Sequence, residues 1–239
     1  MSFQHKLLSL VVVTVLPFCA RAEIVTTSLS GTQLNITVPA KFVRCEATTP
    51  QGQIMLKMAR FGGNQNLVCL ISSEDIAFSK QHSQTRLTEY GLVEVQKGLE
   101  TQTISAQDFA RLKAEMRKQA PANSLQQLTT EGGMSIKEFL NSLSPETAAK
   151  LRFVQQQQII LEIIDSSPRL YSTVFLQKNV AIRDGRPQEA TVIGVMSMIR
   201  IKERLIQAVM VRVLHSKDDF PQLRQQALNW ANEIISANM

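Results

Sequence analysis

The chain has 239 residues, of which 44% are apolar, 19% charged and 5% aromatic, and its formal net charge is +6. This composition excludes collagen-like, intrinsically disordered and multi-span membrane proteins, and it predicts a globular protein. Its basic residues are spread along the chain and mixed with acids, whereas nucleic-acid-binding proteins gather them on one face or in one segment. We therefore expect no nucleic-acid partner.

The first 22 residues have the three parts of a secretory signal peptide. Lys6 gives a positive start, residues 7–18 form an apolar run, and Ala20-Arg21-Ala22 carries small residues at the positions that signal peptidase reads. The run is shorter than the roughly 20 apolar residues that span a bilayer. We expect cleavage, a mature chain that begins at Glu23, and an exported, periplasmic protein. Cys19 leaves a lipoprotein signal open, but a bulky aromatic residue precedes it.

Removal of residues 1–22 leaves two cysteines, Cys45 and Cys69, in a compartment where disulfides persist. Each lies in a stretch with the pattern of a strand, at 42–45 and 66–71. We predict a disulfide between neighbouring strands, which would stabilise the fold by about 3 to 4 kcal/mol on the chain-entropy account. A redox or zinc-binding pair is the alternative, and it is disfavoured because there is no Cys-x-x-Cys spacing and no nearby histidine.

The first third of the mature chain alternates strand-like and turn-like pieces. Residues 24–29 and 33–38 predict a hairpin that leads into 42–47, and residues 53–60 have an ambiguous period before the turn at Gly62-Gly63-Asn64. We expect a small antiparallel unit over 24–78. Residues 90–99 then predict a half-exposed strand.

The apolar period changes at Ser105, where Ser-Ala-Gln-Asp has the spacing of a capping box and apolar residues recur at helical spacing. This pattern predicts an amphipathic helix over 106–119. Residues 120–134 have a loop-like composition and could subdivide an otherwise single domain over 23–239. Short helices are expected at 135–138 and 144–146.

The last third predicts four strands, a hairpin turn at 202–204 and a final helix that Asp218 or Asp219 caps. The strands are expected at 158–164, 171–177, 190–201 and 205–214, as an antiparallel meander. Strands interrupted by packed helices indicate an α+β fold, in which helices flank one curved antiparallel sheet.

The last 50 or so residues resemble those of small exported bacterial proteins that remain uncharacterised. The likeness rests on a strand through Met196–Ile201, a short basic turn, a second strand, and a helix that contains Asn229-Trp230-Ala231 and closes on Ala237-Asn238. More loosely, the order of strands and helices is similar to the PsbP-like architecture. That family's ion-related residues have no counterparts here, so the resemblance implies a fold and no activity.

The sequence offers few groups for catalysis or metal binding. Once His5 is removed, His82 and His215 remain, and both are expected as surface histidines. The pair Glu74-Asp75 ends a predicted strand and lacks the further oxygen ligands of a calcium site. Met196, Met198 and Met210 fall on neighbouring strands, where core packing explains them better than a copper site. We expect no metal and no cofactor.

One basic cluster is harder to explain by packing. Arg200, Lys202 and Arg204 alternate at the tip of the last hairpin, and Arg212 follows on the returning strand. They could be a solvated hairpin end that keeps an edge strand from aggregating. They could instead contact anionic lipid headgroups or an acidic partner protein. These four residues are the candidate partner-binding residues.

The sequence therefore favours an exported, non-enzymatic accessory or binding protein that acts on another envelope protein, with an anionic membrane surface as a further candidate partner. The alternative is a periplasmic carrier or sensor that holds a small apolar or anionic ligand between sheet and helices. A hydrolase ranks third, and it would require a pocket that brings His82 or His215 to a carboxylate and a hydroxyl.

Overall fold

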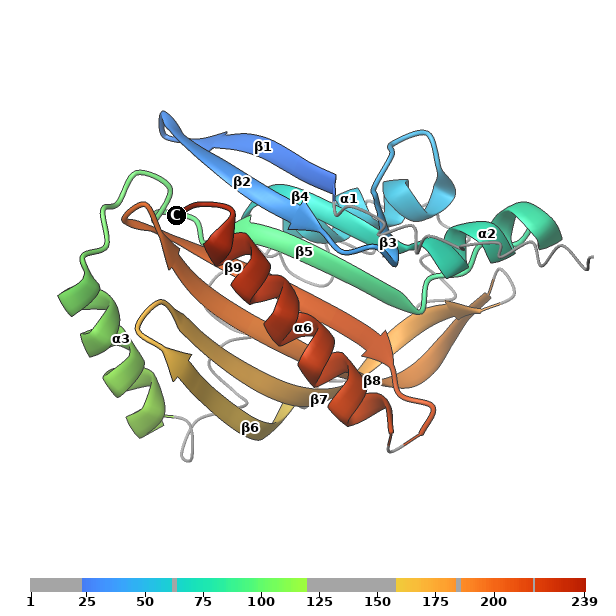
Figure 1. The fold of residues 1–239 in the computed structure, drawn as a ribbon. Coiled ribbons are helices and arrows are strands. Elements are labelled where there is room, and N and C mark those ends of the chain that lie inside the picture. The colour runs from blue at the N-terminus through green and yellow to red at the C-terminus, as the bar shows by residue number, and fades with distance from the viewer. Residues whose placement is uncertain (1–22, 62–63, 120–157, 184–185, 217) are drawn as a thin grey trace, which may run out of the picture.

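The computed structural model describes residues 23–61, 64–119, 158–183, 186–216 and 218–239, and it has the expected α+β fold (Figure 1). In chain order its elements are β1 (Glu23–Leu29), β2 (Thr32–Val38), β3 (Phe42–Arg44), α1 (Pro50–Phe61), β4 (Gln65–Ser72), α2 (Ser73–His82), β5 (Glu89–Val95), α3 (Ala106–Gln119), β6 (Gln158–Ser167), β7 (Leu170–Arg183), β8 (Arg186–Ile201), β9 (Arg204–Val213) and α6 (Asp219–Ser236).

Seven strands form one antiparallel sheet in the order β3-β4-β5-β9-β8-β7-β6. The predicted C-terminal meander is confirmed, because β6, β7, β8 and β9 pair in sequence order. β9 also pairs with β5, which joins the meander to the N-terminal strands. β1 and β2 form a separate two-stranded sheet. The expectation of one antiparallel unit over 24–78 was therefore wrong: the predicted hairpin exists, but only β3 and β4 belong to the large sheet.

α6 lies across one face of the large sheet, with the β1–β2 hairpin beside it (Figure 1). It buries an apolar side at helical spacing, formed by Leu223, Ala227, Trp230, Ala231, Ile234 and Ile235. Trp230 packs on β5 at Gly91, where a Cβ atom would lie 3.3 Å from the indole ring. Its indole Nε1 donates to the Thr37 carbonyl at 2.7 Å, so one side chain ties α6 to β2 and β5.

The last residues of the chain fasten α6 to the hairpin. Asn238 pairs with β2 much as a neighbouring strand would: its Oδ1 accepts from the Asn35 N–H at 2.9 Å, and its Nδ2 donates to the Asn35 carbonyl at 2.6 Å. Asn35 Nδ2 in turn donates to the Ala237 carbonyl at 3.1 Å. The C-terminus therefore has a fixed place beside β2.

The start of α6 differs in detail from the expected cap. Asp218 makes no side-chain capping bond, and the Asp219 carboxylate accepts from the backbone N–H groups of His215 and Ser216, each at 2.7 Å. Burial raises the pKa of Asp219, but these two donors and the nearby Arg212 outweigh it and hold that pKa below its usual value. The acid thus orders the turn before the helix instead of capping the helix itself.

The ambiguous segment 53–60 is part of helix α1. Thr49 begins it: the Thr49 Oγ1 atom accepts from the Gly52 N–H at 3.0 Å, and Pro50 occupies the first helical position. The Thr49-Pro50 pair is a helix-start signal. Gly52, which disfavours a helix, and the weak apolar period make the segment ambiguous in the sequence. Met55 is buried against β4, so the helix covers the other face of the sheet at this end.

The strand predicted over 90–99 is β5, which is shorter and lies inside the sheet instead of half exposed, with Val93 and Val95 fully buried. The helix predicted over 106–119 is confirmed as α3, with the expected cap, since Asp108 N–H donates to Ser105 Oγ at 3.0 Å. The signal peptide, the loop at 120–134 and the short helices at 135–138 and 144–146 lie outside the described residues.

The disulfide between Cys45 and Cys69 is confirmed, and it ties neighbouring strands as expected. β3 pairs with β4 up to Arg44 and Leu70, so Cys45 and Cys69 form the next pair of the register, with Cα atoms 5.3 Å apart. The Cys45 N–H also donates to the Cys69 carbonyl at 2.8 Å.

Replacement of both cysteines by alanine is expected to lower the free energy of unfolding by about 2 to 4 kcal/mol, because the unfolded chain gains the freedom of the opened loop. Urea unfolding of the mature protein with and without dithiothreitol checks this. The reductant should destabilise the wild type and leave the double variant unchanged. Equal stability of the two oxidised proteins would contradict the prediction.

Candidate functional site

The basic tip, which we define as Arg200, Lys202 and Arg204, surrounds the turn between β8 and β9. Lys202 and Glu203 form a two-residue turn in which both have left-handed backbone angles, with φ of 45° and 59°. Turns of this kind prefer Asn and Gly, because a Cβ atom is crowded at positive φ. Charged side chains occupy this turn although other residues would suit its backbone better.

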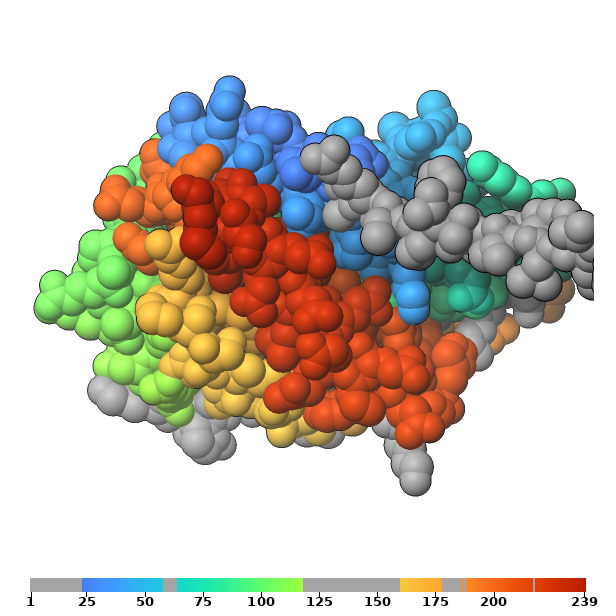
Figure 2. All heavy atoms as spheres, viewed as in Figure 1, coloured from blue at the N-terminus to red at the C-terminus, as the bar shows by residue number. Residues whose placement is uncertain are grey.

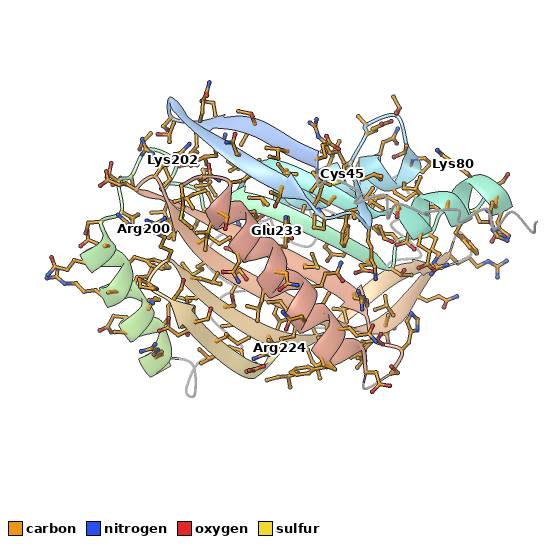
Figure 3. All side chains as sticks on the ribbon, viewed as in Figure 1. Cys45, Lys80, Arg200, Lys202, Arg224 and Glu233 are labelled. Carbon is orange, nitrogen blue, oxygen red and sulfur yellow. A yellow bond between two sulfur atoms is a disulfide. The ribbon has the colours of Figure 1, made fainter. Side chains whose placement is uncertain are left out.

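All three basic side chains of the tip bind carbonyl groups of neighbouring segments. Arg200 Nε donates to the Ile104 carbonyl at 2.7 Å, and Lys202 Nζ donates to the Gln33 carbonyl at 2.8 Å. Arg204 Nη1 reaches the carbonyls of Thr101 and Gln102 at 2.8 and 3.0 Å. The tip thus holds the β1–β2 hairpin and the loop before α3. In these bonds the charged groups meet neutral acceptors, so the tip is held against neighbouring segments instead of being a freely solvated hairpin end (Figure 3).

Arg204→Ala is expected to destabilise the protein by about 0.5 to 1.5 kcal/mol, since it removes charge-assisted hydrogen bonds to two exposed carbonyl groups that water can then hydrate. Lys202→Gln keeps a donor for the Gln33 carbonyl at an exposed site and should change stability by less than about 0.5 kcal/mol. Thermal unfolding of both variants measures this difference. Equal losses would show that the tip does not fasten the loop before α3.

Arg212 lies away from the tip, on the face of the sheet that α6 covers. Its Nη2 atom donates to Glu89 Oε1 at 2.7 Å and to Gln226 Oε1 at 2.8 Å, which links β9, β5 and α6. Its Nε atom is buried and has no hydrogen-bond partner among the residues that the structure describes.

Arg212 lines an open groove of about 760 Å³ between the β2–β3 turn and α6. We call it the α6 groove. Figure 2 shows much of the outer side of α6, in red, uncovered on this face of the molecule. The groove is lined by Pro39, Ala40, Lys41, Arg212, Pro221, Gln222, Gln225, Gln226, Asn229, Trp230 and Glu233. Of the four candidate partner-binding residues, only Arg212 lies here.

The Glu74-Asp75 pair does not end a strand, because both residues lie in the first turn of α2. Asp75 is buried, and its carboxylate accepts from the backbone N–H groups of Thr88 and Glu89 at 2.6 and 3.0 Å and from the Thr88 hydroxyl at 2.8 Å. Arg86 Nε lies 2.9 Å from it. These bonds satisfy the Asp75 carboxylate. They also fix the segment in which Glu89 lies, and thereby hold Glu89 next to Arg212.

Helix, turn and core contacts explain the positions of the histidines and methionines. His82 is the last residue of α2, not part of a loop, and its ring stacks on Phe78 at 4.2 Å. The backbone N–H of His215 belongs to the turn that Asp219 orders. Met196 and Met198 share one sheet face, while Met210 packs in the core on the opposite face. The described residues contain no group of three or more His, Cys, Asp or Glu side chains placed to hold a metal ion.

The described structure is thus an α+β protein with an open, hydrogen-bonding groove along its C-terminal helix. In the part of the chain that is described, no helix is long and apolar enough to cross a membrane. No known protein family matches the sequence, and no curated protein is similar to it. Among solved structures, the chain is similar to the Ran-binding protein Mog1p of Saccharomyces cerevisiae, with 11% identity over 91% of this chain and 94% of that one and a TM-score of 0.37.

Proposed function

We propose that this protein is an exported, non-enzymatic accessory protein that binds another envelope protein through the α6 groove. The observation that carries the proposal is the groove itself, which is open, is lined by Trp230 and Arg212, and displays polar side chains of α6. Aromatic residues and arginine are enriched in protein interfaces relative to the rest of the surface, and the groove lining contains one of each, Trp230 and Arg212. The disulfide supports export, since such bonds persist in oxidising compartments.

Photo-crosslinking in intact cells tests the proposal. Benzoylphenylalanine replaces Gln225 in the groove, Lys202 at the basic tip or, as a control, the exposed Gln188 of β8. We expect one envelope protein to be captured reproducibly from position 225 and not from position 188. Capture from position 202 alone would move the contact to the basic tip. The absence of a specific adduct at both 202 and 225 would refute the accessory function.

Export is tested separately. Cell fractionation followed by N-terminal sequencing should find the protein in the periplasm with Glu23 as its first residue. Recovery of the uncleaved chain in the cytoplasm would overturn the proposed location. A tag for this work belongs after Met239, which is 82% exposed, because Asn238 is engaged with β2.

The same groove favours one second candidate, a carrier or sensor of a small ligand. A small ligand could hydrogen-bond to groove side chains beside Arg212, such as Gln226, whose Nε2 donor takes no part in the bond to Arg212. Native mass spectrometry of the protein purified from its own cells distinguishes the two functions. A stoichiometric adduct of small mass that is lost in Gln226→Ala would favour the carrier.

A further inference from the structure

We propose that the α6 groove takes an extended, acid-containing polypeptide segment of the partner instead of a folded surface. This inference rests on the proposed function and specifies the chemistry of its site. Three properties of the groove carry it: the carboxamide side chains along α6, the length over which they are displayed, and the placement of charge.

The carboxamides of Gln222, Gln225, Gln226 and Asn229 line the groove along α6. A carboxamide both donates and accepts hydrogen bonds, as a peptide group does, so a row of them can pair with the backbone of an extended chain whatever its side chains are. Gln225 Nε2 donates to Asn229 Oδ1 at 2.7 Å, and Gln226 Oε1 accepts from Arg212. These bonds do not involve Gln225 Oε1, Gln226 Nε2 or Asn229 Nδ2, so these atoms remain available to a ligand in the groove.

The row has the length of a short peptide. Gln222 and Glu233 are eleven residues apart in the sequence, which corresponds to about 16 Å along a helix that rises 1.5 Å per residue. An extended chain rises about 3.3 Å per residue, so roughly five residues of a partner would span the groove. The groove is an open trough between one helix and one turn, whereas small-molecule sites enclose most of their ligand.

Charge is distributed unevenly along the trough. Arg212 binds Gln226 in the first half of α6, and the exposed Lys41 lines the opposite wall. Glu233 lines the groove seven residues beyond Gln226, about 10 Å further along the helix. Figure 3 shows Glu233 nearer the end of α6 that leads to the C-terminus, with Arg224 near the other end. Because Glu89 already pairs with Arg212, the exposed Lys41 is the cation that a carboxylate of the partner would meet, away from Glu233.

Position-resolved crosslinking tests this arrangement in cells that carry the full chain. Benzoylphenylalanine is placed at Gln222 in one strain and at Glu233 in another, and mass spectrometry identifies the partner residue that each one reaches. Both crosslinks should map to a single stretch of the partner, about four to six residues apart, with an Asp or Glu nearer the residue reached from position 222.

Each other outcome has a distinct meaning. Crosslinks from 222 and 233 to partner residues far apart in sequence would show a folded interface, which overturns this inference and leaves the proposed function intact. Crosslinks only from the basic tip would also overturn it while a partner still exists. The absence of any partner from the groove and the tip removes the proposed function itself. A small ligand that blocks both crosslinks would show that the groove binds this ligand instead of a polypeptide, as the carrier function requires.

The carboxylate is tested by charge reversal of an exposed residue. Lys41→Glu should lower the crosslink yield from position 222 about fivefold, since reversal of an exposed charge next to a carboxylate changes binding by about 1 kcal/mol. Lys97→Glu makes the same change of net charge at an exposed site outside the groove lining and should leave the yield unchanged. An equal yield in both variants would contradict an acidic segment.

Discussion

Asp75→Ala is expected to lower the free energy of unfolding by about 3 to 5 kcal/mol. The substitution removes the acceptor of two backbone N–H groups and a hydroxyl, and it leaves the half-buried Arg86 without its buried partner. Loss of one member of a buried ion pair has effects of this size because the remaining groups stay desolvated and unpaired. Urea denaturation followed by circular dichroism measures the change.

Glu74→Ala is the matched control. Glu74 is the neighbouring acid and also pairs with Arg86, at 3.1 Å, but its side chain is 77% exposed whereas that of Asp75 is 1% exposed. Exposed ion pairs contribute between about 0 and 1 kcal/mol. Losses of similar size in the two variants would show that the buried bonds of Asp75 do not hold the α2–β5 segment together.

The sequence contains the local signals that place Asp75 but not the contact that explains it. Ser72, with acidic residues at the second and third positions after it, marks a helix start, and Ser72 Oγ does accept from the Glu74 N–H. In the sequence, these residues look like the end of a strand, because β4 runs directly into α2 without a loop. The partners at 86–89 follow from the return of the chain to β5, which depends on tertiary structure.

In the rest of the fold, too, local patterns were predictable from the sequence and long-range contacts were not. Patterns confined to a dozen residues, such as the cap and apolar period of α3 or the alternation of β8 and β9, predicted their elements well. The separate β1–β2 sheet depends on Trp230 and Asn238, which are some 200 residues away and bind β2 through its backbone. Apart from the Asn35 side chain, which donates to the Ala237 carbonyl, these contacts use backbone groups of β2 that leave no mark on its sequence.

The α6 groove could not be predicted from the sequence, for a related reason. Its walls come from Pro39–Lys41 and from α6, and the carboxamides on α6 have the composition of any solvent-exposed helix face. In the sequence, the charge of Arg212 and its place on the strand after the turn group it with the basic tip. Its partners Glu89 and Gln226 cannot be seen there. Arg212 lies eight residues beyond Arg204 on β9, about 27 Å along an extended strand, and its pairing with Glu89 places it beside β5.

Trp230→Ala should lower the free energy of unfolding by about 3 to 5 kcal/mol, the usual range for removal of a buried tryptophan. Trp230 is 2% exposed, fills the space over Gly91 and joins three elements of the fold. Leu228→Ala on the same helix is the comparison, because Leu228 is only partly buried against the same core and does not line the groove. It should cost clearly less in the same urea titration.

Trp230→Phe separates the stability of the fold from the shape of the groove. The ring remains, but the Thr37 carbonyl loses its buried donor, which should cost about 1 to 3 kcal/mol. Thr37 lies two residues before Pro39, so loss of this bond frees the turn that forms one wall. Crosslinking from position 225 should therefore fall in Trp230→Phe and persist in Leu228→Ala when both variants are folded. Equal crosslinking in the two would show that the turn is not part of the binding surface.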